Sequence, residues 1–107
     1  MNDVMTTARL LAVVNQLSQE LGPDATLRQV AALLHIGQAS HAGIDGVTLE
    51  KKTDSSQAAT SRTFKLLSQT HGLVEFFLDQ ADGRRRLARL TGAGNKLLAK
   101  LARLLQQ

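Results

Sequence analysis

The residues with the clearest chemical potential lie in the stretch ADGRRRLARLTGAG, residues 81–94. It holds three consecutive arginines, Arg84, Arg85 and Arg86. Adjacent cations repel one another, so such a run is stable where water solvates it or where an anion binds it. A guanidinium presents a planar fork of N–H donors that matches phosphate oxygens. The stretch therefore predicts either a solvated turn or an anion-binding tip, in which Asp82 can pair with one guanidinium and orient it.

A second candidate group follows the helical period between residues 57 and 65. Gln57, Ser61 and Lys65 recur every four residues, so a helix would place them on one face, with Arg62 beside them. Glutamine can bond adenine in two places, arginine can bond guanine or phosphate, and lysine more often serves a phosphate. The residues predicted to contact DNA from this helix and its start are Ser55, Ser56, Gln57, Thr60, Ser61, Arg62 and Lys65.

The charge of the chain is unevenly distributed along its 107 residues. Residues 1–46 hold two arginines against four carboxylates, a net charge of −2. Residues 47–107 hold eleven lysines and arginines against five carboxylates, a net charge of +6. An electropositive half of this kind favours a polyanion as the partner.

Composition and motifs exclude several other classes of site. The sequence has no Cys, so thiol catalysis, thiolate metal sites and disulfides are excluded. The three histidines are His35, His41 and His71; the first two are six residues apart and share no helical face, so we expect exposed polar residues and no metal site. No HExxH, P-loop or GxSxG motif is present. We therefore expect no catalytic residue, no cofactor and no enzyme.

Two helices are predicted ahead of the basic half. Residues 3–21 carry apolar side chains at the helical period, and Gly22-Pro23 ends the pattern. The segment TLRQ, residues 26–29, matches a capping box, which predicts a second helix from there to about Ser40. The segment AGIDG, residues 42–46, then indicates a loop.

A short helix over residues 47–52 and a stronger helix, QAATSRTFKLLSQ, are predicted next. Good N-cap residues stand between them, namely Asp54, Ser55 and Ser56. Within the stronger helix Thr60, Phe64 and Leu67 recur at i, i+4 and i+7, so they are expected to face the core.

A β-hairpin and a last helix complete the predicted order. LVEFFL, residues 73–78, is apolar, β-branched and aromatic, which is typical of a strand. Residues 79–83 are rich in turn formers, and RRLARL, residues 85–90, alternates as a returning strand does. Thr91 can cap the last helix.

This order predicts a mainly α fold with a small β-hairpin wing, an α+β winged helix-turn-helix, over a single domain of residues 1–107. Residues 47–91 are the predicted DNA-binding core with its wing, and residues 1–22 and 92–107 the predicted dimerisation helices. In this layout the helix after the turn enters the major groove, and an arginine from the hairpin tip reaches a narrow minor groove. The residues predicted to contact DNA from the wing are Asp82, Arg84, Arg85 and Arg86.

The terminal helices carry more leucine than a lone helix easily hides. Each fully buried leucine contributes roughly 1.5–3 kcal/mol, and exposing several favours aggregation. We therefore expect a homodimer interface formed by Leu10, Val14, Leu17, Leu97, Leu98, Leu101, Leu104 and Leu105. The alternative is that the same residues cover the chain's own core. A two-fold dimer would set two recognition helices about one DNA turn, roughly 34 Å, apart.

The wing residues also carry a family resemblance. Asp82-Gly-Arg84-Arg-Arg followed by Leu90-Thr91-x-x-Gly94 resembles the wing and wing exit of the multiple-antibiotic-resistance regulator (MarR) family. TLRQVAALLHI is similar to that family's second helix, SSQAATSRTFKLL to its recognition helix, and HGLV to the entry of its wing. The resemblance covers roughly residues 26–105, with about one extra residue near 68–70.

The resemblance implies a dimeric, triangular, mostly helical transcription factor bound to a palindromic operator. By that match Asp82 would brace the wing, and Arg84 or Arg86 would enter the minor groove. Family members often bind small phenolic effectors. With three Phe and no Trp or Tyr, however, we expect no sizeable pocket and no obligatory ligand in this chain.

Together these observations predict a sequence-specific regulator of transcription that binds double-stranded DNA, a homodimeric repressor. No apolar run approaches the roughly 20 residues that cross a membrane, and the N-terminus lacks the basic region of a signal peptide, so we expect a cytoplasmic, nucleoid-associated protein. Two alternatives stay open. One is a winged helix that docks an acidic protein, and the other is a sequence-neutral DNA-coating protein of a mobile element.

Overall fold

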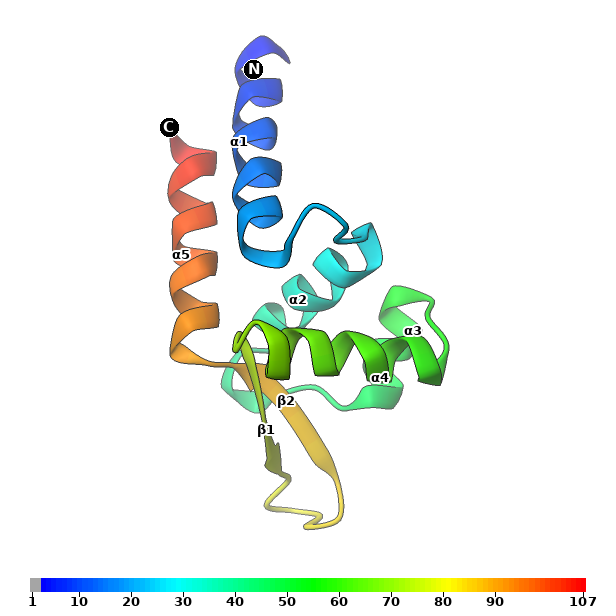
Figure 1. The fold of residues 1–107 in the computed structure, drawn as a ribbon. Coiled ribbons are helices and arrows are strands. Elements are labelled where there is room, and N and C mark those ends of the chain that lie inside the picture. The colour runs from blue at the N-terminus through cyan, green and yellow to red at the C-terminus, as the bar shows by residue number, and fades with distance from the viewer. Residues whose placement is uncertain (1–2) are drawn as a thin grey trace.

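The computed structural model describes residues 3–107 and contains the predicted order of elements (Figure 1). Its α-helices are α1 (Asp3–Leu21), α2 (Leu27–Ala39), α3 (Gly46–Thr53), α4 (Gln57–Lys65) and α5 (Gly92–Gln106). The other elements are a 3₁₀ turn, η1 (Ser40–Ala42), a π-helical turn, η2 (Leu66–Thr70), and the strands β1 (Val74–Leu78) and β2 (Arg86–Leu90). The predicted fold class, mainly α with a β-hairpin wing, is confirmed.

Each α-helix after α1 begins at a side chain that accepts one of its free N–H groups. Thr26 and Gln29 form the predicted capping box at the start of α2. Ser56 caps α4 and Thr91 caps α5, as the sequence indicated. Asp45, which the sequence analysis did not single out, caps α3.

The elements form a stalk, a helical body and a projecting hairpin. α1 and α5 run antiparallel, side by side, and carry both chain ends to the same end of the molecule (Figure 1). α2, α3 and α4 form the body, and the β1–β2 hairpin projects from the opposite side (Figure 1). The largest fully buried side chains are Leu33, Ile36, Leu49 and Leu67, which join α2, α3 and the end of the α4 segment. The body thus has an aliphatic core, and the base of the hairpin packs against it through Val74 and Ala88.

The segment predicted as one helix, QAATSRTFKLLSQ, changes its winding near its end. After Lys65 the chain makes the π-helical turn η2, and Leu67 stays fully buried within it. A π turn accommodates one residue more than an α turn does. The extra residue expected near residues 68–70 therefore falls inside a widened helical turn.

The hairpin is anchored at its base to the loop before α3. β1 and β2 pair antiparallel, with Phe76 opposite Ala88. Ile44 adds an isolated bridge to Ala88, with N–H···O distances of 3.0 and 2.8 Å. Gly43 precedes it with φ of +78°, and a Cβ there would lie 2.7 Å from the ring of Phe77. The expected AGIDG loop therefore pairs with β2 at one residue, Ile44, and the glycine before it lets the backbone pass close to the ring of Phe77.

Three of the residues predicted for the dimer interface lie inside the chain. Leu17, Leu97 and Leu101 are buried in the chain's own core, so the prediction that they contact a second copy is wrong. The reason is that α1 and α5 pack against each other and α5 also packs against α2, which uses one apolar face of each stalk helix. For these residues the alternative, coverage of the chain's own core, holds.

The other predicted interface residues keep accessible surface. Leu98 and Leu104 are half-buried against the same core, and Leu10, Val14 and Leu105 are about half exposed. The apolar stripe of α1 is thus exposed in the first half of the helix and buried in the chain's own core in the second half.

Candidate nucleic-acid interface

The polar stripe predicted on the helix after the turn lies on the accessible side of α4. Gln57, Ser61 and Lys65 are exposed, and so is Arg62 beside them. α3 packs against α4, and Asp54 ends α3 in the left-handed conformation that reverses the chain. These two helices and their short turn form a helix-turn-helix.

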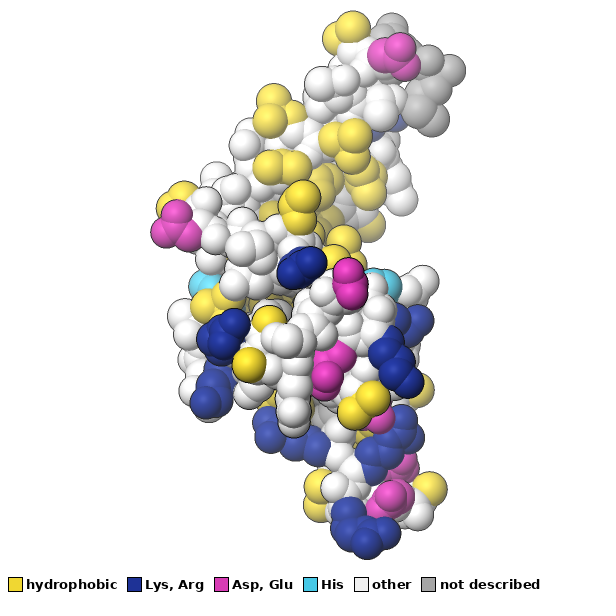
Figure 2. All heavy atoms as spheres, turned by 90° about the vertical axis from the view of Figure 1, so that its right-hand side faces the viewer, with side chains coloured by type: hydrophobic (Ala, Val, Ile, Leu, Met, Phe, Trp, Pro, Cys, Tyr) yellow, Lys and Arg dark blue, Asp and Glu magenta, His cyan; other side chains and the backbone are white. Residues whose placement is uncertain are grey.

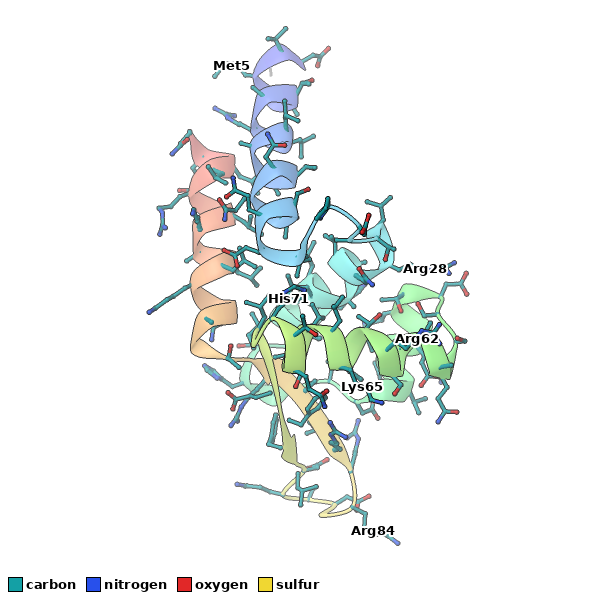
Figure 3. The ribbon with its side chains drawn as sticks, in the orientation of Figure 1. Met5, Arg28, Arg62, Lys65, His71 and Arg84 are labelled. Carbon is teal, nitrogen blue, oxygen red and sulfur yellow. The ribbon has the colours of Figure 1, made fainter. Side chains whose placement is uncertain are left out.

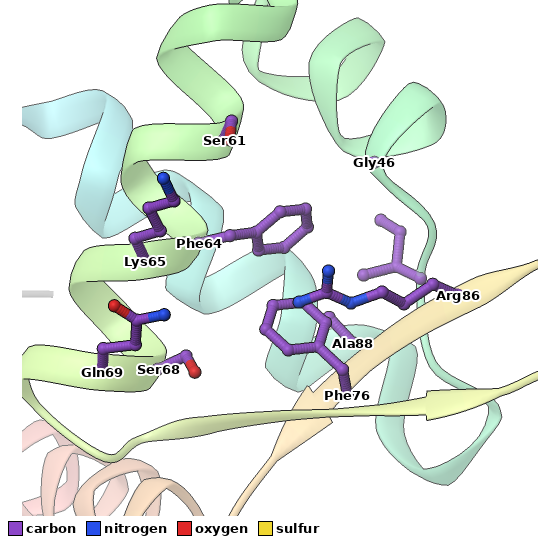
Figure 4. Close-up of a pocket in the computed structure, with 10 residues that line it drawn as sticks. Gly46, Ser61, Phe64, Lys65, Ser68, Gln69, Phe76, Arg86 and Ala88 are labelled. Carbon is purple, nitrogen blue, oxygen red and sulfur yellow. The ribbon is translucent and has the colours of Figure 1, made fainter.

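A cleft of about 310 Å³ separates this stripe from the hairpin. Ser61 and Lys65 of α4 lie on one side of it and Arg86 of β2 on the other (Figure 4). The rings of Phe64 and Phe76 meet edge to face inside it, with their centroids 5.2 Å apart. The expectation that no sizeable pocket exists is therefore corrected, because two of the three phenylalanines come together between α4 and the hairpin.

A second hollow of about 280 Å³ extends the first toward the start of α4. It is lined by Gln57 and Ser61 of α4, by Glu50 of α3, and by Arg85 and Arg86 of the hairpin. Because Ser61 and Arg86 line both hollows, the polar stripe of α4 and the hairpin form one continuous surface.

Two of the residues predicted to contact DNA face the protein itself. Thr60 is only 4% exposed, so its predicted contact with DNA is wrong. It lies on the core-facing side of α4, as its i, i+4, i+7 spacing with Phe64 and Leu67 predicted. Ser55 is half-buried, and its hydroxyl donates to the carbonyl of Thr53 at 3.3 Å. Ser56 is exposed, and its oxygen accepts the N–H of Ala59 at 3.0 Å. The two serines therefore shape the start of α4.

Arg84 occupies the tip of the hairpin, and 95% of its side chain is exposed (Figure 3). The Asp82 carboxylate accepts the backbone N–H of Arg84 at 3.1 Å and lies 3.6 Å from its Nε. The predicted pairing of Asp82 with a guanidinium is therefore present, and Arg84 is the arginine that the hairpin extends into solvent.

Arg85 and Arg86 turn back onto the protein instead. Arg85 forms ion pairs with Asp45 at 3.1 Å and with Asp79 at 3.2 Å. The guanidinium of Arg86 stacks 3.7 Å above the ring centroid of Phe76, at the edge of the larger cleft. The three neighbouring arginines, which the sequence could not distinguish, thus have three different environments.

Asp45 has a perturbed carboxyl group. Hydrogen bonding with Thr48 lowers the pKa of Asp45 below its ordinary value, partial burial acts in the opposite direction, and Arg85 lowers the pKa further. The lowering effects prevail, so the carboxylate is ionised throughout the neutral range and the pair with Arg85 persists there.

Many of the exposed cations gather on the body and the hairpin. Figure 2 shows Lys and Arg side chains gathered over the helical body and the hairpin, while apolar side chains line the stalk. The exposed cations of the body and hairpin include Lys51, Lys52, Arg62, Lys65, Arg84 and Arg86. Lys96, Lys100 and Arg103 are exposed as well, but on α5 of the stalk, so the basic half of the sequence is spread over both parts of the molecule.

The histidines are less exposed than expected. His41 is exposed, but His35 and His71 are half-buried, and Nε2 of His71 is enclosed by the protein. Among residues 3–107, no three His, Asp or Glu side chains gather as metal ligands would. Over the same residues, none of the helices is both long and apolar enough to cross a bilayer.

Solved structures share this arrangement of helices, turn and hairpin. The S. aureus MepR–DNA complex matches with a TM-score of 0.76 and 19% identity, over 96% of this chain and 81% of that chain. MarR matches with a TM-score of 0.64 and 24% identity, over 94% of this chain and 72% of that one. A probable transcriptional regulator from Pseudomonas aeruginosa gives a TM-score of 0.64 at 25% identity, over 92% and 74%. No family model and no curated protein matches the sequence.

The chain has a MarR-type winged-helix fold. The resemblance that the wing motif indicated is thereby confirmed. In this fold α4 occupies the position of the recognition helix and the β1–β2 hairpin that of the wing, and these two names are used below.

Two carboxylates that bind the wing arginine Arg85 were not predicted as site residues: Asp45, at the start of α3, and Asp79, in the turn of the hairpin. Asp45 carries a local signal, because an Asp just before a helical segment is a preferred N-cap. Its pair with Arg85, 40 residues away, has no local signal. Asp79 was assigned to a turn, which is correct, but its contact with Arg85 depends on how the hairpin closes.

Proposed function

We propose that this protein is a regulator of transcription that binds double-stranded DNA, not an enzyme, and that it acts as a homodimer on a palindromic operator. One observation carries the proposal: the exposed polar stripe of the recognition helix and the exposed arginine of the wing belong to one cationic part of the molecule. The MepR structure that this fold resembles was solved as a complex with DNA, which supports the same partner here.

The recognition helix would lie in the major groove. Gln57, Ser61 and Arg62 are exposed on it and carry the donors and acceptors that base edges require. Lys65 lines the cleft opposite Arg86 of the wing, where an ammonium group suits a phosphate. Ser56, at the N-cap of the same helix, adds an exposed hydroxyl for the backbone of the DNA.

The wing would reach the adjacent minor groove through Arg84. Its side chain is extended and oriented by Asp82, and a narrow minor groove concentrates negative potential that attracts a guanidinium. Arg86 lies closer to the body, so we assign it to the phosphate backbone beside the cleft.

A second copy of the chain would complete the interface through the exposed end of α1. Its apolar residues there are Val4, Met5, Leu10, Leu11 and Val14, and Leu105 of α5 is exposed as well. Burial of each such side chain contributes roughly 1.5–3 kcal/mol. A dimer of this kind would cover the operator, and we propose that occupation of the operator represses transcription in the cytoplasm, at the nucleoid.

The proposal is tested by selecting binding sites from a random double-stranded DNA library at physiological salt with excess competitor DNA. The expected result is a palindromic motif with half-sites about one turn, 10–10.5 base pairs, apart. Gel-shift titration of the selected duplex, against a scrambled duplex of the same composition, then measures the specificity.

Two outcomes would contradict the proposal. Binding without a motif that disappears as salt rises would indicate a sequence-neutral DNA-coating protein. No binding at low salt would leave the alternative of a winged helix that docks an acidic protein.

A further inference from the structure

Arg85 connects the wing to the first helix of the helix-turn-helix. Its Nη2 and Nε lie 3.1 and 3.2 Å from Oδ2 of Asp45, at the start of α3. Its Nη1 lies 3.2 Å from Oδ2 of Asp79, in the turn of the wing. One guanidinium therefore joins two elements that are far apart in the sequence.

Each of the two carboxylates divides its oxygens between two tasks. Asp45 uses Oδ1 to accept the N–H of Thr48 at 3.0 Å, which caps α3, and Oδ2 to bind Arg85. Asp79 uses Oδ1 to accept the N–H of Ala81 at 2.9 Å, which closes the local turn, and Oδ2 to bind Arg85. A Ser, Thr or Asn could perform the local task alone, whereas both tasks together require a carboxylate.

The backbone of Arg85 is fixed as firmly as its side chain. Its N–H donates to the carbonyl of Asp82 at 2.9 Å, and its carbonyl accepts the N–H of Asp79 at 2.8 Å. Three residues further along, Ala88 forms the bridge to Ile44. The wing is thus attached at two points, through Arg85 to Asp45 at the start of α3 and through Ala88 to Ile44 in the loop before α3. These two attachments fix the direction of the wing relative to α3 and α4.

We propose that Arg85 is a positioning residue: through Asp45 and Asp79 it holds the wing at the angle at which Arg84 and the recognition helix engage neighbouring grooves together. This inference rests on the proposed DNA-binding function. It differs from the sequence-based prediction that Arg85 contacts DNA together with Arg84 and Arg86. Preorganisation of this kind strengthens binding because the ordering of the wing precedes the encounter with DNA.

The competing assignment, a direct phosphate contact by Arg85, predicts the opposite effect at Asp45. Removing a carboxylate beside a phosphate-binding arginine frees that arginine and removes repulsion, so DNA binding would strengthen. If Arg85 positions the wing, removing the charge of Asp45 releases the wing and DNA binding weakens. The sign of the change therefore distinguishes the two roles.

Asp45→Asn is the informative variant. Asparagine still caps α3 with its one oxygen, but its amide group then presents a donor to Arg85 and the bridge is lost. Glu50→Gln is the matched control, because it removes one negative charge from the same hollow but from a carboxylate other than the two that bind Arg85. We expect Asp45→Asn to weaken binding to the selected operator about tenfold, a typical coupling between linked sites. Glu50→Gln should bind equally or more tightly.

A double-mutant cycle with Arg84→Ala completes the test. Without Arg84 the wing has no groove contact to position, so Asp45→Asn should have no further effect in that background. Arg85→Lys should behave like Arg85→Ala, because a single ammonium group cannot span both carboxylates, whereas a phosphate contact would be rescued by lysine. Tighter binding by Asp45→Asn, the same loss in both backgrounds, or rescue by lysine would overturn the proposal.

A measurement on the free protein separates this proposal from the proposed function. Backbone ¹⁵N relaxation of Gly83 and Arg84 should give lower order parameters in Asp45→Asn than in the wild-type protein. Unchanged order parameters would overturn the positioning role even if the wild-type protein selects an operator. The other outcome is that the order parameters fall in Asp45→Asn but the wild-type protein selects no DNA. That result would overturn the DNA-binding function, and with it the role of Arg85 in DNA binding.

Discussion

At the scale of residues, immediate neighbours give chemically identical side chains different roles. Arg84 extends from the tip, Arg85 lies between two carboxylates, and Arg86 stacks on an aromatic ring. The same holds on α4, where Thr60 is buried one position before the exposed Ser61. A role in DNA binding is therefore assigned by exposure and by existing partners rather than by residue type.

Arg62→Ala and Lys65→Ala should have distinguishable effects on DNA binding. If Arg62 bonds a guanine edge, its loss costs about 1–3 kcal/mol and relaxes the preference at one base pair. Loss of Lys65, a phosphate contact, should weaken binding equally on all sequences and reduce the salt slope by about one. Site selection repeated with each variant, with salt titrations, measures both effects. Equal weakening by Arg62→Ala on every duplex would contradict the base contact.

The lowered pKa of Asp45 predicts a contribution to stability that depends on pH. Because hydrogen bonding with Thr48, and then Arg85, lowers its pKa in the folded protein, the contribution is fully present above the unfolded pKa of about 3.9. It is lost as the pH falls through the lower folded value. The difference in the free energy of unfolding between wild type and Asp45→Asn should therefore shrink below about pH 4. Urea unfolding at pH 7, 5, 4 and 3 measures it, and a difference that grows on acidification would contradict this assignment.

At the scale of elements, the exit from the wing determines how α5 meets the body. Thr91 donates its hydroxyl hydrogen to the carbonyl of Gly72 at 2.7 Å, and its oxygen accepts the N–H of Gly94 at 3.1 Å. Its own N–H bonds the carbonyl of Leu73 at 2.9 Å. The Leu-Thr-x-x-Gly motif is therefore a junction that joins the hairpin, the turn before it and the start of α5.

Gly94→Ala should destabilise the protein, whereas Gly92→Ala should not. A Cβ at Gly94 would lie 2.3 Å from the carbonyl oxygen of Leu73, so α5 must shift, at a cost of about 1–3 kcal/mol. A Cβ at Gly92 meets nothing within 4 Å, and alanine there should be neutral or stabilise by up to about 1 kcal/mol. Urea unfolding of both variants makes the comparison. Equal stability of the two would contradict the close approach at this junction.

At the scale of the whole molecule, two different surfaces are held apart. The stalk exposes apolar side chains on α1, while many cations gather on the body and the hairpin, on the face drawn in Figure 2. Apolar surface that one chain leaves uncovered favours association, and self-repelling cations favour an anionic partner. The proposed homodimer and the proposed DNA complex therefore use opposite ends of each chain.

Leu10→Asp should convert a dimer into a monomer at micromolar concentration. The residue lies in the exposed part of the α1 stripe, and a carboxylate buried in an apolar interface loses its hydration without a partner. Leu27→Asp is the control, because Leu27 is 88% exposed on α2, away from the stalk. Sedimentation velocity measures the mass of each variant. A wild-type monomer, or an unchanged mass of Leu10→Asp, would contradict the proposed interface.

Local signals determined most of the secondary structure from the sequence alone. The capping box at Thr26, the caps at Ser56 and Thr91, the end of α1 before Gly22 and the hairpin were all predicted correctly. Each depends on hydrogen bonds or on hydrophobic periodicity within a few residues, which a linear sequence displays directly. The element order that follows was enough to indicate the winged helix.

Only the tertiary structure decided which side chains remain available to a partner. The stripe of α1 has the same apolar period throughout, yet Leu17 is buried and Leu10 is exposed, because the body covers only one end of the stalk. Arg84 and Arg85 are adjacent, yet the side chain of Arg84 is exposed at the tip beside Asp82, and that of Arg85 is held by Asp45 from 40 residues away. Burial and long-range ion pairs depend on which elements meet in space, and that geometry has no signal within a local stretch of sequence.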